Sequence, residues 1–158
     1  QSAQYRILEF TLGNKSRSTM AVYKHQPEWY ARLEQALNSP SLYEEFLLHL
    51  KRRGMPIPQQ AIDRDFSVAR GEDDEVIEAL KIIYENRADH WARYETCEAL
   101  MDIANNFHFW RFHHMKTVER IIGHKSGSGG SSGVSFLKKA LDIEFFPELI
   151  RVRTEIGQ

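Results

Sequence analysis

The stretch WRFHHMKTVERIIGHKSGSGGSSG, residues 110–133, decides the fold because it joins an apolar helical stripe to a loop rich in glycine and serine. The members of the stripe follow one another at steps of three or four residues: Leu100, Ile103, Phe107, Trp110, His114, Val118 and Ile121. This spacing keeps side chains on one face of an α-helix. It therefore predicts a long helix with His114 on its inward face, while His113 and His108, about 100° of rotation per residue away, point elsewhere.

Two interpretations of His114 are open from its position alone. A histidine on an apolar face is often a core residue that is satisfied by a hydrogen bond. It can also be an axial ligand of haem iron, for which Phe107, Trp110, Val118 and Ile121 would form the flat apolar wall that the macrocycle needs. The spacing does not separate the two interpretations.

The glycine-rich loop also has competing interpretations. Glycine and serine runs are typical of flexible linkers. Here, however, the loop leads to the amphipathic segment VSFLKKALDI, and the free N–H groups of a helix start favour a carboxylate or phosphate. The loop is no nucleotide-binding motif, because Lys125 precedes the glycines and Val134 follows them. The dinucleotide fingerprint fails as well, since Ser132 stands where its third glycine should be.

The rest of the chain is predicted to be helical, and no segment has a convincing strand pattern. The expected helices cover residues 2–12, 27–37, 40–53, 59–64 and 73–84, with a long one over 89–122 and Ser39 as the cap of the third. The long helix would measure on the order of 50 Å. The prediction is thus an all-α fold that is built around one long helix.

Composition excludes several classes of function. The chain has 158 residues, 42% of them hydrophobic, which suits one domain with a real core. With 21 basic and 22 acidic residues it has no charge excess that would attract nucleic acid or an anionic membrane. Cys97 is the single cysteine, so an internal disulfide is impossible and a cytoplasmic location is expected. No stretch approaches the roughly 20 apolar residues of a membrane span.

The residues also resemble a known family. Residues 110–154, 1–15 (QSAQYRILEFTLGNK) and 39–47 (SPSLYEEFL) look like bacterial members of the tryptophan 2,3-dioxygenase family. The resemblance implies a haem-dependent oxidoreductase that opens the indole ring of L-tryptophan with O2 to give N-formylkynurenine, the first step of the kynurenine pathway. It further implies haem b (iron protoporphyrin IX) as cofactor and a homotetramer. The implied organisation is one helical haem-dioxygenase domain over 1–158, with a helical excursion at 26–88 and a substrate loop at 123–133.

Site residues follow from the same resemblance. The second histidine of the WRFHH motif matches the proximal haem ligand of the family, which is His114. Ser128 matches the loop residue that contacts the amino-acid end of the substrate, although the family usually has threonine there. Serine keeps the hydroxyl and loses a methyl, so hydrogen bonding should survive. Tyr5, in the QYR motif, would lie near the haem and substrate pocket.

In the family, the distal histidine and the arginine that binds the substrate carboxylate belong to a segment upstream of the QYR motif. The motifs that carry these two residues do not occur in this sequence. We therefore expect the chain to be the C-terminal part of a longer protein, and no catalytic residue is assigned in it. Two alternatives remain at this point. A non-catalytic haem-binding sensor or carrier would keep His114 without needing Ser128 or the glycines. A helical small-molecule module would bind no haem, and its lack of colour would reveal it.

Overall fold

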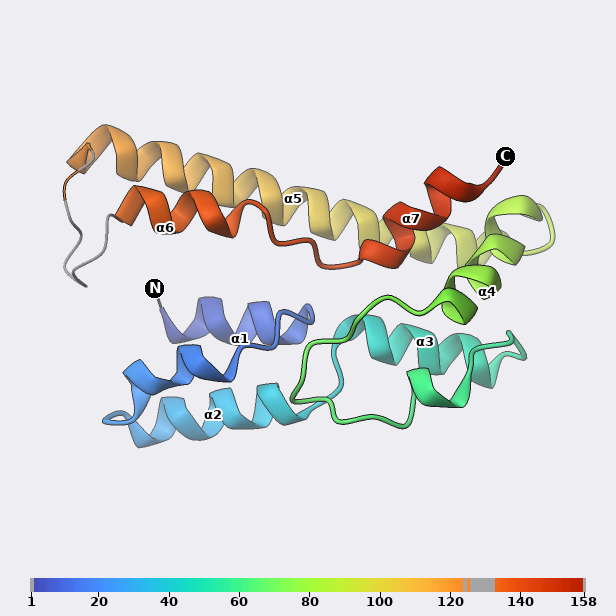
Figure 1. Ribbon diagram of the computed structural model, residues 1–158, viewed down its shortest axis with the longest axis horizontal. Helices are drawn as coiled ribbons and strands as arrows, with labels where there is room; N and C mark the ends of the chain where they lie inside the picture. The colour runs from blue at the N-terminus through green and yellow to red at the C-terminus, as the bar shows by residue number, and fades with distance from the viewer. Residues whose placement is uncertain (1, 124, 126–132, 158) are drawn as a thin grey trace. The chain divides into compact units, whose positions relative to one another are not determined.

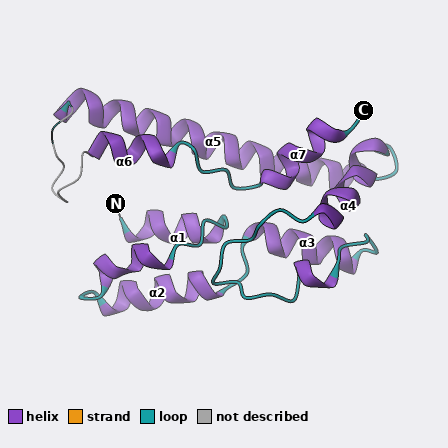
Figure 2. Ribbon diagram, in the orientation of Figure 1, coloured by secondary structure: helices purple, strands orange, loops and turns teal. Residues whose placement is uncertain are grey.

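The computed structural model describes residues 2–123, 125 and 133–157. Every regular element in this part of the chain is a helix, which confirms the predicted all-α class (Figure 2). Figure 1 labels the α-helices, and the two 3₁₀ helices are called η1 and η2. The bounds are α1 Ala3–Thr11, η1 Arg17–Tyr23, α2 Pro27–Asn38, α3 Leu42–Arg52, η2 Gln59–Ala61, α4 Asp74–Glu85, α5 Trp91–Ile122, α6 Gly133–Ala140 and α7 Pro147–Glu155.

The chain divides into two compact units. The first unit consists of residues 1–94 and 147–158, and the second consists of residues 95–146. Helix α5 contributes its first turn to the first unit and the rest to the second. No helix in the described ranges is both long and apolar enough to cross a membrane.

Side-chain caps explain where several helices begin. The Ser2 hydroxyl accepts a hydrogen bond from the Tyr5 N–H at 3.2 Å and caps the start of α1. The Asp73 carboxylate accepts the N–H groups of Glu75 and Val76 and starts α4. These caps satisfy backbone donors that have no partner within the helix.

The predicted cap of α3 is wrong by two residues. Ser41, not Ser39, caps this helix through a reciprocal pair of hydrogen bonds. The Ser41 N–H donates to the Glu44 carboxylate at 2.7 Å, and the Glu44 N–H donates to the Ser41 hydroxyl at 3.3 Å. The reason is the position of Glu44, because a capping box needs an acidic side chain three residues after the serine. The Ser39 hydroxyl instead donates to the Gln35 carbonyl at the end of α2.

Among the described residues of the first unit, the core includes two parts that position its helices. Helices α1, η1 and α2 enclose one cluster, in which α1 packs beside α2 (Figure 1). Its buried members are Ala3, Phe10, Met20, Tyr23, Leu33 and Leu37. The second part lies between α4 and α7, which pack against each other although they are distant in sequence. Leu80, Ile83, Leu149 and Val152 are fully buried there.

A buried carboxylate ties α7 to the segment before α4. Glu148 is 1% exposed and forms an ion pair with Arg70 at 2.9 Å. It also accepts the Asp73 N–H at 3.0 Å. Burial raises the pKa of Glu148, and the Arg70 guanidinium opposes that rise. The contact joins residues 75 to 78 positions apart and fixes the return of the chain to its first unit.

In the second unit, α6 runs back along the C-terminal half of α5 (Figure 1). A Cβ on Gly133 would lie 3.7 Å from the Ile122 side chain, so the two helix ends meet. Lys138 lies 4.0 Å from Glu119, and Arg111 donates to the Ile143 carbonyl at 3.2 Å. These contacts place α6 antiparallel to α5.

Candidate functional site

The face of α5 that carries His114 is exposed. The buried residues of this helix are Cys97, Leu100, Arg111 and Met115, and His114 is not among them. The prediction that His114 faces inward is therefore wrong for this chain. A core histidine held by a buried hydrogen bond is excluded with it.

The seven-residue stripe in fact straddles the edge of the buried face. Leu100 is buried and Phe107 and Val118 are half-buried, whereas Ile103, Trp110 and Ile121 are 41%, 49% and 74% exposed. At about 100° per residue, these three exposed side chains lie within roughly 40° of His114 around the helix axis, and Arg111 and Met115 lie roughly 60–100° to the other side. The prediction for His114 failed because the apolar residues of α5 span a wider sector of the helix than the face that the rest of this chain buries. In addition, Arg111 lies near the centre of the buried face, and a charged residue is not expected there.

The imidazole of His114 stacks on the indole of Trp110. Their ring centroids lie 5.3 Å apart and the ring planes differ by 1°. Trp110 in turn contacts Phe107, with centroids 5.8 Å apart. In the described part of the chain, the contact found for the His114 ring is this stacking on Trp110.

This environment fits an axial haem ligand. Haem iron takes a neutral histidine nitrogen as its proximal ligand and needs an apolar surface for the macrocycle. His114 offers an accessible imidazole, and Ile103, Trp110 and Ile121 flank it with exposed apolar groups. The described ranges contain no group of three or more His, Cys, Asp or Glu side chains able to hold a metal ion.

Arg111 belongs to the surroundings of His114 and was not predicted from the sequence. It is 3% exposed, and its guanidinium carbon lies 4.8 Å from the Phe107 centroid and 4.7 Å from the Phe145 centroid. The one sequence signal for its burial is that this charged residue stands among aromatic side chains, three positions before His114. A charge at such a position is usually assigned to the solvent.

The other two predicted site residues lie elsewhere. Tyr5 is half-buried on α1, in the first unit, with the Arg6 guanidinium 5.8 Å from its ring centroid. Arg6 forms a 2.5 Å ion pair with Glu9, which is 1% exposed. His114 belongs to the second unit, and Ser128 lies outside the described residues, as does most of the loop over 123–133.

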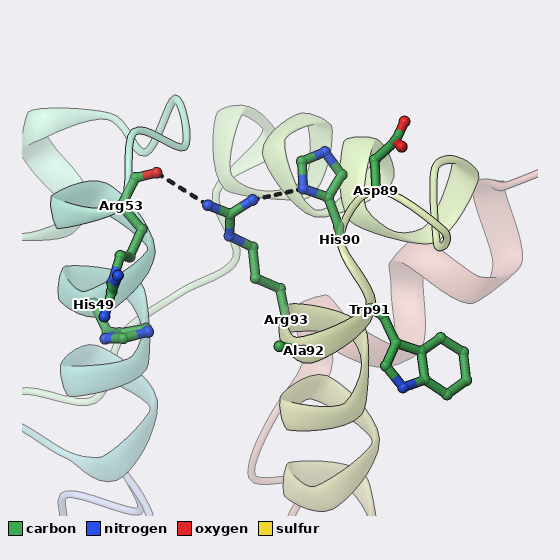
Figure 3. Close-up of a pocket in the computed structure, with 7 residues that line it drawn as sticks. All are labelled: His49, Arg53, Asp89, His90, Trp91, Ala92 and Arg93. Atoms are coloured by element: carbon green, nitrogen blue, oxygen red, sulfur yellow. Dashed lines mark hydrogen bonds between the residues drawn. The ribbon is translucent and has the colours of Figure 1, made fainter.

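The first unit also contains a hollow of about 420 Å³ at the start of α5. Its lining is rich in arginine and histidine: His49, Arg53, Asp89, His90, Trp91, Ala92 and Arg93. Figure 3 shows the Arg93 guanidinium between its two partners, the His90 ring and the Arg53 carbonyl. The distances are 2.6 Å to His90 Nδ1 and 3.0 Å to the Arg53 oxygen. Because Arg93 already joins the end of α3 to the start of α5, we interpret this hollow as a structural joint, and none of the predicted site residues lines it.

Comparison with known proteins identifies the family. A sequence model described as Tryptophan 2,3-dioxygenase matches residues 58–156. A protein of Serratia proteamaculans (strain 568) with that name is 54% identical over 157 residues, covering 99% of this chain and 56% of the relative. The protein of that name from Arthrobacter sp. (strain FB24) is 52% identical over 158 residues, covering 100% of this chain and 56% of the relative. The protein of that name from Myxococcus xanthus (strain DK1622) is 51% identical over 156 residues, covering 99% of this chain and 54% of the relative.

The chain therefore spans little more than half the length of these relatives, with the match running through both compact units. Both the WRFHH motif and the glycine-rich loop fall within the residues that the family model covers. On this evidence the chain belongs to the tryptophan 2,3-dioxygenase family.

Proposed function

We propose that the chain forms the proximal side of a haem pocket in an enzyme that opens the indole ring of L-tryptophan with O2. Both oxygen atoms enter the product, N-formylkynurenine, and the bond between C2 and C3 of the indole breaks. The observation that carries the proposal is the accessible imidazole of His114 in the middle of an exposed apolar stripe. The names of the relatives favour a dioxygenase over a haem sensor or carrier.

His114 is proposed as the axial ligand of haem b. Haem, when bound, supplies the iron that activates O2. The chain's own contribution is to present a neutral imidazole nitrogen in a fixed orientation, for which the stacked Trp110 ring is suited. Ile103, Trp110 and Ile121 would exclude water from that side and so strengthen the electrostatic interactions within the pocket.

Ser128 and Tyr5 are proposed as substrate-binding residues. A serine hydroxyl both donates and accepts hydrogen bonds, so Ser128 can serve either the carboxylate or the ammonium of an amino acid. Holding the amino-acid end fixes the indole relative to the oxidant and lowers the entropic cost of the reaction. A loop over 123–133 that closes on substrate would also exclude solvent.

A homotetramer is proposed as the assembly. Phe109 and Phe112 are 59% and 40% exposed, and they lie on a side of α5 different from that of His114. By helix geometry the rotation between the two sides is roughly 140–160°. The helix thus has two exposed aromatic faces, one suited to a cofactor and one to a neighbouring subunit.

Replacement of His114 by alanine tests the ligand assignment. We expect His114→Ala to lose stable haem binding, measured as the ratio of Soret to protein absorbance after reconstitution. His113→Ala is the matched control, because His113 is also exposed on α5 but points about 100° away. A His114→Ala protein that retains haem with an unchanged Soret band would contradict the assignment.

A further inference from the structure

A buried arginine lies one helical turn from the proposed haem ligand. The Arg111 guanidinium lies over two adjoining rings, those of Phe107 and Phe145, at 4.8 and 4.7 Å from their centroids. Its Nη1 donates to the Ile143 carbonyl at 3.2 Å. Burying a guanidinium is costly unless it is partnered, and Arg111, which is 3% exposed, has these rings and this carbonyl as partners.

The rings beside Arg111 form a continuous series that ends at His114. Phe145 meets Phe107 edge to face, with centroids 5.2 Å apart and planes at 76°. Phe107 contacts Trp110 at 5.8 Å, and Trp110 stacks on His114 at 5.3 Å. Each ring limits the rotation of the next, because aromatic pairs prefer a narrow range of edge-to-face and offset geometries.

Arg111 is suited to hold the first members of this series. A guanidinium is attracted to aromatic faces, so one that lies over two adjoining rings can restrict both of them. Its hydrogen bond to Ile143 also anchors the segment that connects α6 to α7. Trp110 is half exposed and His114 is exposed, so this chain gives them no enclosing core. The orientation of Trp110 and His114 therefore has to be fixed from the buried end of the series of rings, where Arg111 lies.

We propose that Arg111 is a positioning residue that fixes the orientation of the His114 imidazole through Phe107 and Trp110. The importance of that orientation for an iron ligand rests on the proposed function. The orientation itself is a property of the chain and can be measured without haem.

The test is the NMR spectrum of the haem-free protein with labelled histidine. Protons over the face of an indole ring are shielded, so the ring protons of His114 should resonate upfield of their random-coil positions. We expect Arg111→Met, which keeps the length of the side chain, to remove most of that upfield displacement while the amide spectrum stays folded. An unchanged His114 shift in folded Arg111→Met would overturn the proposal.

Two further variants keep the test decisive. Phe145→Leu removes the other ring that holds the guanidinium, so it should reduce the displacement even if Arg111→Met does not fold. Arg87→Met is the control, at an exposed arginine with similar contacts: its guanidinium lies 4.8 Å from the Tyr94 centroid and donates to the Tyr84 carbonyl at 3.2 Å, in the first unit. Arg87→Met should leave the His114 shifts unchanged. Equal changes in all three variants would mean a general loss of structure and would overturn the specific role of Arg111.

A second readout uses the reconstituted protein. The stretching frequency of the bond between ferrous iron and its histidine ligand depends on imidazole orientation, and we expect it to shift in Arg111→Met and Phe145→Leu but not in Arg87→Met. If the parent chain binds no haem, the proposed function fails, whereas the NMR measurement still decides whether Arg111 orients His114. An NMR result without effect, in a protein that binds haem, overturns the inference and leaves the proposed function standing.

Discussion

The side chain of Lys15 caps the C-terminal end of α2. Its ammonium donates to the carbonyl groups of Ala36, Leu37 and Ser39 at 2.7, 3.1 and 2.7 Å. The last carbonyls of a helix have no partner within it, so a buried cation at this point satisfies them. Burial lowers the pKa of Lys15 from 10.5 to about 8, against the opposing charge of Glu44 and together with that of Arg64.

This lowered pKa predicts a pH-dependent stability. Between pH 8 and 10.5 the unfolded chain binds more protons at Lys15 than the folded chain, so the contribution of Lys15 to the free energy of unfolding rises with pH in this window. The slope is at most about 1.4 kcal/mol per pH unit. Urea unfolding measures the free energy of unfolding of the parent and of Lys15→Met. The value for the parent minus the value for Lys15→Met should therefore increase from pH 8 to pH 10. A difference that stays constant would contradict the prediction, and Lys24→Met, at an exposed lysine, is the control.

At the residue scale, the sequence singles out His114 as a candidate but does not predict its surroundings. The motif around His114 is specific enough to select it, since only this histidine lies on the apolar stripe. Its exposure could not be predicted, because periodicity finds an apolar sector without showing which part another group covers. Arg111 could not be predicted either, since its burial depends on Phe145, a residue 34 positions further along the chain.

At the scale of elements, local signals predicted most of the helices and their starts. Pro27 and Asp73 mark the beginnings of α2 and α4 as expected, and α5 ends at Ile122 as predicted. Helices η1 and α7 were not predicted individually. Helix α7 depends on packing against α4 and on the Glu148 contact, and both are tertiary interactions. Such interactions override weak local propensity.

The capping box of α3 gives a prediction at this scale. Ser41→Ala should lower the free energy of unfolding by about 0.5–2 kcal/mol, because it leaves the Glu44 N–H without its buried acceptor. Ser39→Ala should cost less than about 0.5 kcal/mol, since that hydroxyl only donates to a carbonyl on the surface of α2. Chemical denaturation of both variants measures the difference. Equal costs would mean that the capping box contributes nothing specific.

At the scale of the whole molecule, the C-terminal helix completes a unit that begins at the N-terminus. Glu148 is the polar part of that closure, through Arg70 and the Asp73 N–H. Removing one partner of a buried pair leaves the other charge uncompensated. The first unit therefore requires residues from both ends of the chain, which no local pattern reveals.

Glu148→Ala should consequently destabilise the protein by roughly 3–5 kcal/mol. Glu144→Ala, at an exposed glutamate just before α7, should change stability by less than about 0.5 kcal/mol. Thermal unfolding followed by circular dichroism compares the two. A Glu148→Ala protein as stable as the parent would show that apolar packing between α4 and α7 closes the unit without the carboxylate.

The haem pocket that His114 is proposed to anchor is the feature on which the proposed activity depends. The most direct test is the absorption spectrum of the purified, reduced protein before and after addition of L-tryptophan. We predict a Soret band that shifts on addition of L-tryptophan and does not shift with an amino acid that lacks the indole. Absence of haem binding, or a Soret band that L-tryptophan leaves unchanged, would contradict the proposed function.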